Sequence, residues 1–215
     1  MNLKIVKKGK KKVILTKNLV KGEKVYGERL YKIENIEYRE WNPYRSKLAA
    51  AIIKKVRGIN INKDSLVLYL GAASGTTVSH ISDIVTNGLI FSVEFSYKVI
   101  YNLVLLSYKR KNIIPIYEDA NFPERYLNIV LPCDIVIQDI AQRNQVDIFL
   151  KNINYYLKKD GIGVLFVKSR SIDVTKTPDE IFKKVRNELS KKLDIIDFSR
   201  LEPYEKDHAV FVCKL

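Results

Sequence analysis

The sequence is poor in the residues that build metal centres. Its 215 residues include two cysteines and two histidines. Cys133 and Cys213 lie inside apolar runs, so they predict buried thiols in a reducing compartment. His80 and His208 lack partners at metal-site spacing, and we therefore predict no structural or catalytic metal. His80 lies on the apolar side of a predicted helix, where a structural role is expected.

Long apolar runs are also absent, and none approaches the length that spans a membrane. The lysine-rich start contains one apolar stretch, Val13-Ile14-Leu15, which is too short for a signal peptide. The chain shows no internal repeat and no low-complexity segment. These features predict a soluble, cytoplasmic protein without membrane contact.

Acidic residues are scarce in the first part of the chain. Residues 1–57 contain 17 Lys and Arg against 5 Asp and Glu, whereas residues 58–215 contain 21 against 19. A basic segment before a near-neutral one is typical of a polyanion-binding face. The lysine cluster alone would also suit a solubilising tail. The aromatic residues between the cations favour nucleic acid as the partner; they are Tyr26, Tyr31, Tyr38, Trp41 and Tyr44.

Short stretches of β-type residues occur around residues 11–16, 24–30 and 31–36. We expect them to form a small antiparallel sheet. Ser46 is a suitable N-cap for a helix that runs from Lys47 to about Arg57 and stops at Gly58. Residues 1–57 are therefore expected to form a small basic β domain with a linking helix.

The remainder, residues 58–215, alternates short apolar runs with helical patterns. The runs are rich in Val and Ile, as is typical of parallel strands covered on both faces by helices. We expect strands at residues 66–70, 89–93, 113–117, 134–138 and 162–167. We expect helices near residues 77–86, 97–109, 143–157 and 178–191.

The last two apolar segments, residues 193–201 and 208–215, are joined by a connection too short for a crossover helix. They must therefore pair antiparallel. A mostly parallel sheet with an antiparallel last strand is found in Rossmann-like methyltransferases, whereas nicotinamide dehydrogenases usually keep that strand parallel.

A loop of small residues follows the first predicted parallel strand, with the sequence Gly71-Ala72-Ala73-Ser74-Gly75-Thr76-Thr77. Ala73 replaces the second glycine of a dinucleotide-binding loop, and no Gly-Lys-Ser/Thr motif is present. Thr76 and Thr77 offer hydroxyls and helix-start amides that suit a ligand with a carboxylate. The alternative is an ordinary tight turn.

The next two predicted strands end in the acidic residues Glu94 and Asp119. The carboxyl ends of parallel strands meet at the crevice in which open α/β sheets bind ligands. Glu94, about twenty residues past the loop, is expected to accept two ribose hydroxyls. Asp119 is expected to accept an adenine amino proton, next to the backbone of Ala120 and an apolar wall formed by Phe95. By itself, Asp119 would suit an ordinary loop.

Asp139 and Lys168 end the fourth and fifth predicted strands, so we expect them to meet in the same crevice. A lysine after an apolar strand is often only a solvated strand end. His208 begins the last strand, and a lone histidine is more often structural than catalytic. The pairing of Lys168 with Asp139 favours the functional interpretation.

Four segments resemble archaeal members of the fibrillarin family of RNA 2′-O-methyltransferases. They are WNPYRSKLAAAI (41–52), LYLGAASGTT (68–77), VKSRSIDVTK (167–176) and EPYEKDH (202–208). The strand ends SVEF, EDAN and QDIAQ match the family's S-adenosylmethionine contacts, and the resemblance extends over essentially the whole chain. It implies a small N-terminal β domain followed by a Rossmann-like, S-adenosylmethionine-dependent methyltransferase domain.

The resemblance also implies which residues act. The family's catalytic set falls on Lys47, Asp139, Lys168 and His208. The cofactor site falls on Gly71, Thr76, Thr77, Glu94, Phe95, Asp119, Ala120, Asp139, Ile140, Ala141 and Gln142. We expect Lys168 to remove the ribose 2′-proton and Lys47 to supply positive charge, although which lysine is the base stays open. Asp139 would hold the lysines, and His208 would orient the ribose or assist proton movement.

The family's partners are a box C/D guide RNA, a Nop-domain scaffold protein and a kink-turn-binding protein, with rRNA or tRNA as substrate. Three alternatives stay open. The first is a guide-independent RNA 2′-O-methyltransferase, in which Glu202 or Glu205 replaces His208. The second is a non-enzymatic RNA-binding scaffold of the same fold, which the intact crevice residues disfavour. The third is a nicotinamide oxidoreductase, which Ala73 and the antiparallel last strand disfavour.

Overall fold

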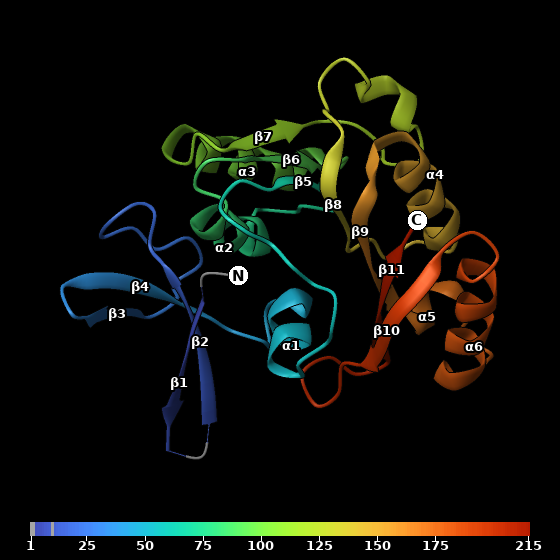
Figure 1. Cartoon of the computed structure of the whole chain (residues 1–215), viewed down its shortest axis with the longest axis horizontal. Helices are drawn as coiled ribbons and strands as arrows, with labels where there is room; N and C mark the ends of the chain where they lie inside the picture. Colours follow the sequence, from blue (N-terminus) through green and yellow to red (C-terminus); the bar gives the residue numbers. More distant parts are fainter. Residues whose placement is uncertain (1–2, 10) are drawn as a thin grey trace.

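The protein contains a small four-stranded sheet and a larger seven-stranded sheet, shown in Figure 1. The computed structural model describes residues 3–9 and 11–215. Within this part of the chain, no helix is long and apolar enough to cross a bilayer. The same residues contain no group of three or more His, Cys, Asp and Glu side chains placed to hold a metal ion.

Two antiparallel hairpins form the small sheet, in the order β1-β2-β4-β3. One consists of β1 (Leu3–Lys8) and β2 (Lys11–Lys17), the other of β3 (Leu30–Ile33) and β4 (Ile36–Trp41). The predicted small antiparallel sheet is confirmed. Its first strand, β1, has no counterpart among the predicted strands.

Two of the predicted small-sheet strands are wrong. Most of residues 24–30 is irregular, because the Glu28 carboxylate accepts backbone N–H groups of the same loop at 2.9–3.1 Å. This local bonding takes the place of a strand ladder. The predicted strand over residues 31–36 is interrupted by a turn at Glu34 and Asn35, whose φ angles are 51° and 63°. Two consecutive positive φ values are typical of the tight turn of a hairpin.

The larger sheet has the strand order β10-β11-β9-β8-β5-β6-β7. Strands β9, β8, β5, β6 and β7 run parallel to one another. Strand β11 runs antiparallel to both of its neighbours, β9 and β10. The predicted mostly parallel sheet with an antiparallel last strand is therefore confirmed. The bounds are β5 (Leu66–Leu70), β6 (Leu89–Val93), β7 (Ile113–Ile116), β8 (Cys133–Gln138), β9 (Leu157–Lys168), β10 (Asp194–Arg200) and β11 (His208–Lys214).

Helices cover both faces of the larger sheet. They are α1 (Lys47–Ile53), α2 (Thr76–Ile84), α3 (Tyr97–Lys109), α4 (Gln145–Tyr156), α5 (Ser169–Ile172) and α6 (Pro178–Leu189), with a 3₁₀ turn at Pro123–Tyr126. Helices α1, α2 and α3 share one apolar core with Ile14 and Trp41 of the small sheet. Helices α4 and α6 pack in a second core on the opposite face. Both faces are buried, which explains the continuous apolar runs of the strands.

Helix α1 begins where expected but ends four residues early. The Ser46 side chain caps it by accepting the N–H of Ala49 at 3.3 Å. Its end is closed by hydrogen bonds from the N–H of Lys55 to Ile52 and from the N–H of Val56 to Ala51. This is a Schellman closure with Lys55, at φ 60°, in the position that glycine usually occupies. Because lysine does not indicate a left-handed backbone conformation, the sequence did not predict this helix end, and the expected stop at Gly58 was too late.

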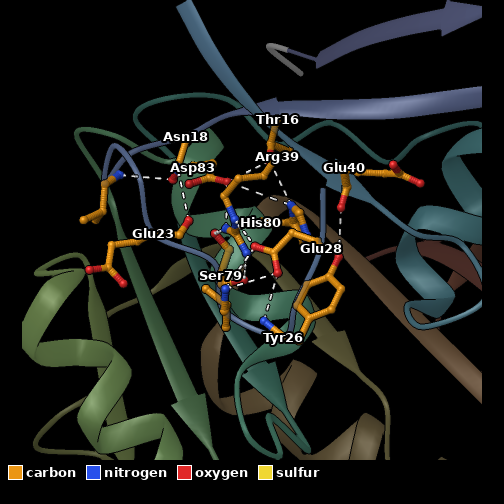
Figure 2. A network of polar contacts seen from close by, with 12 residues as sticks. Thr16, Asn18, Glu23, Tyr26, Glu28, Arg39, Glu40, Ser79, His80 and Asp83 are labelled. Atoms are coloured by element: carbon orange, nitrogen blue, oxygen red, sulfur yellow. Dashed lines mark hydrogen bonds and ion pairs between the residues drawn. The ribbon is translucent and has the colours of Figure 1, made fainter. Parts of the chain in front are cut away.

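A cluster of buried polar side chains joins the small sheet to α2 (Figure 2). The Arg39 guanidinium contacts Glu28 at 2.5 Å and Asp83 at 2.9 Å, and Arg110 contacts Asp83 at 2.6 Å. His80 lies between Thr16 and Tyr26, at 2.8 and 2.7 Å, and is fully buried. We call this group the Arg39–Asp83 cluster; it comprises Thr16, Tyr26, Glu28, Arg39, Ser79, His80, Asp83 and Arg110.

The Arg39–Asp83 cluster pairs each buried charge with an opposite one, which is the condition under which buried charges are tolerated. His80 carries no charge there: burial, reinforced by Arg39 and Arg110, lowers its pKa well below the usual range. The small sheet and α2 are therefore connected by specific polar contacts as well as by the shared core. The division at residues 57 and 58 stays a prediction.

Candidate active site

The turn from β5 into α2 draws three strand ends together. The N–H groups of Gly71 and Ala72 donate to the carbonyl of Val93, at the end of β6. Gly71 has φ 82°, and a Cβ there would lie 2.5 Å from the carbonyl oxygen of Asp139. Only glycine fits this close approach. The small-residue loop therefore sets the distance between the ends of β5, β6 and β8.

A pocket of about 270 Å³ lies over these strand ends. Nine of the eleven predicted cofactor residues line it: Gly71, Glu94, Phe95, Asp119, Ala120, Asp139, Ile140, Ala141 and Gln142. Ala73, Val93 and Glu118 line it as well. Val93 and Glu118 adjoin the predicted residues Glu94 and Asp119, and Ala73 lies in the predicted loop two residues after Gly71, so position alone could have identified them.

The Glu94 carboxylate is buried and fixed at the pocket wall. It accepts the N–H of Ala73 at 2.9 Å through one oxygen and the N–H of Ser96 at 2.8 Å through the other. Each carboxylate oxygen can accept a second hydrogen bond. Two positioned acceptors therefore face a ligand that carries adjacent hydroxyl groups.

Asp119 belongs to a chain of hydrogen bonds along the pocket rim. It accepts the backbone and side-chain N–H of Asn121, both at 2.9 Å. The Asn121 amide also donates to Gln142 at 3.1 Å and accepts from Asn144 at 2.7 Å. Asp119 is thus held with one oxygen engaged and the other available. Phe95 is 57% exposed and supplies an apolar wall.

Thr76 and Thr77 are not among the residues that line this pocket. The Thr77 hydroxyl donates to Ser46 at 3.0 Å, and so ties the first turn of α2 to the N-cap of α1. Thr76 begins α2, and its carbonyl accepts the Ser79 hydroxyl at 2.8 Å. A contact from these residues to a ligand stays a prediction.

A second pocket, of about 210 Å³, adjoins the first. It is lined by Lys47, Asp139, Ile140, Ala141, Phe166, Lys168, Glu205 and His208. The four predicted catalytic residues are therefore brought together from α1 and from β8, β9 and β11. Phe166 was not predicted, but it lies two residues before Lys168 on the same face of β9.

The two pockets share Asp139, Ile140 and Ala141. At this junction the Lys47 ammonium lies 2.8 Å from the Asp139 carboxylate, and both side chains are 22% exposed. An ion pair with this exposure can exchange contacts with solvent or ligand. His208 lies directly across from Lys168 in the β11–β9 register.

His208 presents one open acceptor. Its Nδ1 lies 2.7 Å from the carbonyl oxygen of Lys206, and because a carbonyl only accepts, Nδ1 carries the proton. Burial lowers the pKa of His208, and the positive charge of Lys47 lowers it further. The hydrogen bond to Lys206 and the Glu205 carboxylate, 3.9 Å away, each raise the pKa of His208 and so partly offset this lowering. The ring is therefore neutral near pH 7, with Nε2 unprotonated.

The first pocket suits a nucleoside. Gly71 leaves room for close approach, Glu94 offers acceptors for ribose hydroxyls, and Asp119 offers one for an amino group. The second pocket has two lysine side chains, a carboxylate and an imidazole, which suit proton removal beside a developing negative charge. Because the two pockets share part of their lining, groups bound in them would lie next to each other.

Comparisons with known proteins agree with this geometry. A family model described as Fibrillarin matches residues 1–215. A fibrillarin-like rRNA/tRNA 2′-O-methyltransferase of Pyrococcus furiosus is 52% identical over 202 residues, which cover 94% of this chain and 89% of the relative.

Two solved structures have the same fold. Aeropyrum pernix fibrillarin in complex with natively bound S-adenosyl-L-methionine superposes with a TM-score of 0.87 and 43% identity, over 94% of this chain and 89% of the other. The fibrillarin chain of a fibrillarin/Nop5p complex superposes with a TM-score of 0.86 and 44% identity, over 94% and 93%. The predicted Rossmann-like methyltransferase fold is therefore confirmed.

Proposed function

The chain belongs to the fibrillarin family, and from this premise we propose that it methylates ribose 2′-hydroxyls of rRNA and tRNA with S-adenosylmethionine as the donor. One observation carries the proposal. A nucleoside-sized pocket and a pocket lined by two lysines, a carboxylate and a histidine share Asp139, Ile140 and Ala141. A donor in the first pocket and a hydroxyl in the second would meet at this wall.

In this proposal, nine predicted residues of the first pocket hold S-adenosylmethionine. Glu94 accepts its ribose hydroxyls, Asp119 accepts its amino group, and Phe95 covers its base. The cofactor supplies an activated methyl group on a sulfonium, so the leaving group needs no acid. Asp139, at the shared wall, favours positive charge there. Thr76 and Thr77 are proposed to contribute main-chain contacts near the carboxylate.

The protein's task in this proposal is to place the ribose hydroxyl and remove its proton. Lys168, as the neutral amine, accepts the proton and becomes an ammonium, while Lys47 stabilises the negative charge on the oxygen and is itself held by Asp139 at 2.8 Å. His208, with Nδ1–H fixed on the Lys206 carbonyl, turns its unprotonated Nε2 to the pocket as an acceptor for the ribose.

We further propose that the chain is the catalytic subunit of a box C/D guide ribonucleoprotein in the cytoplasm. A similar fibrillarin is known in complex with Nop5p, which supports a Nop-domain scaffold as partner. A guide RNA that selects the nucleotide and a kink-turn-binding protein complete the proposed assembly. The excess of cations in residues 1–57 supports contact with RNA.

Reconstitution tests the proposal directly. The chain is combined with a box C/D guide RNA, a complementary target, the kink-turn protein and S-adenosylmethionine, with and without the scaffold. We expect methyl transfer at the single guided ribose, and only with the scaffold present. Equal methylation of naked RNA would favour a guide-independent enzyme. Failure to bind S-adenosylmethionine would favour a non-enzymatic scaffold.

A further inference from the structure

A third hollow lies between the small sheet, α1 and the loop before β11. It is close to the second pocket, which we call the catalytic pocket after its proposed role. The third hollow has a cavity volume of about 590 Å³. We call it the Tyr44–Tyr204 groove; it is lined by Lys12, Val13, Glu40, Trp41, Asn42, Pro43, Tyr44, Ile53, Lys54, Pro203 and Tyr204. Figure 1 shows the β10–β11 connection passing next to α1 at this place.

Two tyrosines form the outer part of the groove and are held in place. The rings of Tyr44 and Tyr204 meet edge to face, with centroids 5.1 Å apart. Tyr44 is 60% exposed, yet its backbone is fixed by a hydrogen bond from its N–H to Asn42 at 2.9 Å. Tyr204 is half-buried and packs against the apolar core, which leaves Tyr44 as the exposed ring. An exposed aromatic ring on a rigid turn is typical of surfaces that contact nucleic acid.

The groove also carries unbalanced positive charge. Lys54 donates to the carbonyl of Glu202 at 3.0 Å, and this leaves two of its three N–H groups for a ligand. Lys12 is exposed and stands opposite Lys7, another exposed lysine, in the β1–β2 register. Like charges directly opposite each other destabilise a hairpin, so a bound anion would relieve this repulsion. The acidic lining residue Glu40 accepts the Tyr31 hydroxyl at 2.8 Å.

Two chain segments carry lining residues of both the groove and the catalytic pocket. Tyr44 is followed three residues later by Lys47, and Tyr204 is followed directly by Glu205, which lines the catalytic pocket. A chain bound in the groove would therefore lie close to the catalytic pocket.

We propose that the Tyr44–Tyr204 groove binds the sugar-phosphate backbone of the substrate RNA strand next to the methylated ribose. Lys12 and Lys54 contact phosphates, and the two tyrosine rings contact sugars. This inference rests on the proposed function and adds the surface that positions the acceptor. Because all of these contacts are to the backbone, they act equally on every target sequence.

The test compares groove and control variants in the reconstituted particle with two unrelated guide–target pairs. The charge variant is Lys12→Gln/Lys54→Gln, and its matched control is Lys183→Gln/Lys184→Gln on exposed positions of α6. The ring variant is Tyr44→Ala/Tyr204→Ala, and its control is Tyr101→Ala/Tyr108→Ala on α3, where both tyrosines are exposed. A Tyr44→Phe/Tyr204→Phe variant keeps the rings.

We expect the charge variant to raise the KM for RNA about tenfold and to lower the salt slope of RNA binding by about 0.7 per lysine. The kcat and the KM for S-adenosylmethionine should change less than twofold. The ring variant should raise the KM for RNA to a similar extent. The Phe variant and both controls should match the wild type. The effects should be equal for the two targets.

Three results would overturn the inference. They are an unchanged RNA KM and salt slope in the groove variants, an effect confined to one target sequence, and an effect explained by lost binding of the scaffold in a pull-down. A wild-type chain that fails to methylate any guided target would reject the proposed function instead. In that case, titration of fluorescent RNA with the isolated chain variants still tests the groove.

Discussion

The Arg39–Asp83 cluster and the catalytic pocket both contain cations, carboxylates and a histidine, but they differ in exposure. The side chains of Arg39 and Asp83 are 0% exposed, whereas those of Lys47 and Asp139 are 22% exposed. Asp83 accepts from four groups. A buried carboxylate whose oxygens already accept four hydrogen bonds cannot bind a ligand. An ion pair in contact with solvent still can.

The comparison shows how similar side chains serve two purposes. In the cluster, charges hold the small sheet on α2, since removal of one partner leaves another charge buried. In the catalytic pocket, charges surround a space that a substrate can enter. Burial, more than residue type, separates the structural group from the functional one.

Asp83→Ala should give the largest effect, because it leaves Arg39 and Arg110 buried without their shared carboxylate. We expect a loss of about 3–5 kcal/mol in the free energy of unfolding, measured by urea denaturation at pH 7. Glu188→Ala, which removes an exposed partner of Lys184 on α6, is the control and should cost less than about 0.5 kcal/mol. A loss of under 1 kcal/mol for Asp83→Ala would mean that the arginines do not depend on it.

Lys168→Met should affect catalysis and leave the fold intact. We expect the methylation rate of the assembled particle to fall by at least about 100-fold, the usual contribution of a general base. S-adenosylmethionine affinity and the unfolding midpoint should stay unchanged. Lys159→Met, an exposed position at the other end of β9, is the matched control. Near-normal turnover would transfer the role of base to Lys47 or His208.

Two residues of the catalytic pocket were predictable because they stand at strand ends. Asp139 and Lys168 follow continuous apolar runs, and parallel strands bring such positions to one edge. His208 and Lys47 came from the resemblance to fibrillarin, since neither spacing nor composition places α1 beside β11. The structure brings them together through the shared core of α1 and the pairing of β11 with β9.

The Arg39–Asp83 cluster was not predictable. Thr16 and Asp83 are 67 positions apart, and Asn18 and Arg110 are 92 apart, so no local pattern connects them. In the sequence, Arg39 is one of many cations in a basic segment, where a solvated role is usual. The irregular loop around Glu28 was misread because Val25 and Tyr26 donate to the Glu28 carboxylate, which Arg39 of β4 holds in turn.

His80 should make the stability of the fold depend on pH. Its pKa is lowered in the folded state by burial, so below about pH 6.5 the unfolded chain takes up a proton that the folded chain does not. The free energy of unfolding should therefore fall as pH drops from 6.5, by up to about 1.4 kcal/mol per pH unit from this residue. His80→Gln should reduce the slope between pH 7 and 5.5. An unchanged slope would mean that other groups cause it.

The smallest expected effect concerns His208, which should respond to its neighbours because its pocket is open. Lys47 lowers the pKa of His208 and Glu205 raises it. Lys47→Met should therefore move the His208 titration to higher pH, and Glu205→Gln should move it to lower pH, as followed by the ring signals in NMR. High salt should reduce both shifts, because exposed charges are screened. The His80 signals should stay unchanged in both variants, since no change reaches the Arg39–Asp83 cluster. If the His80 signals shifted together with those of His208, the Arg39–Asp83 cluster would not be isolated from the catalytic pocket.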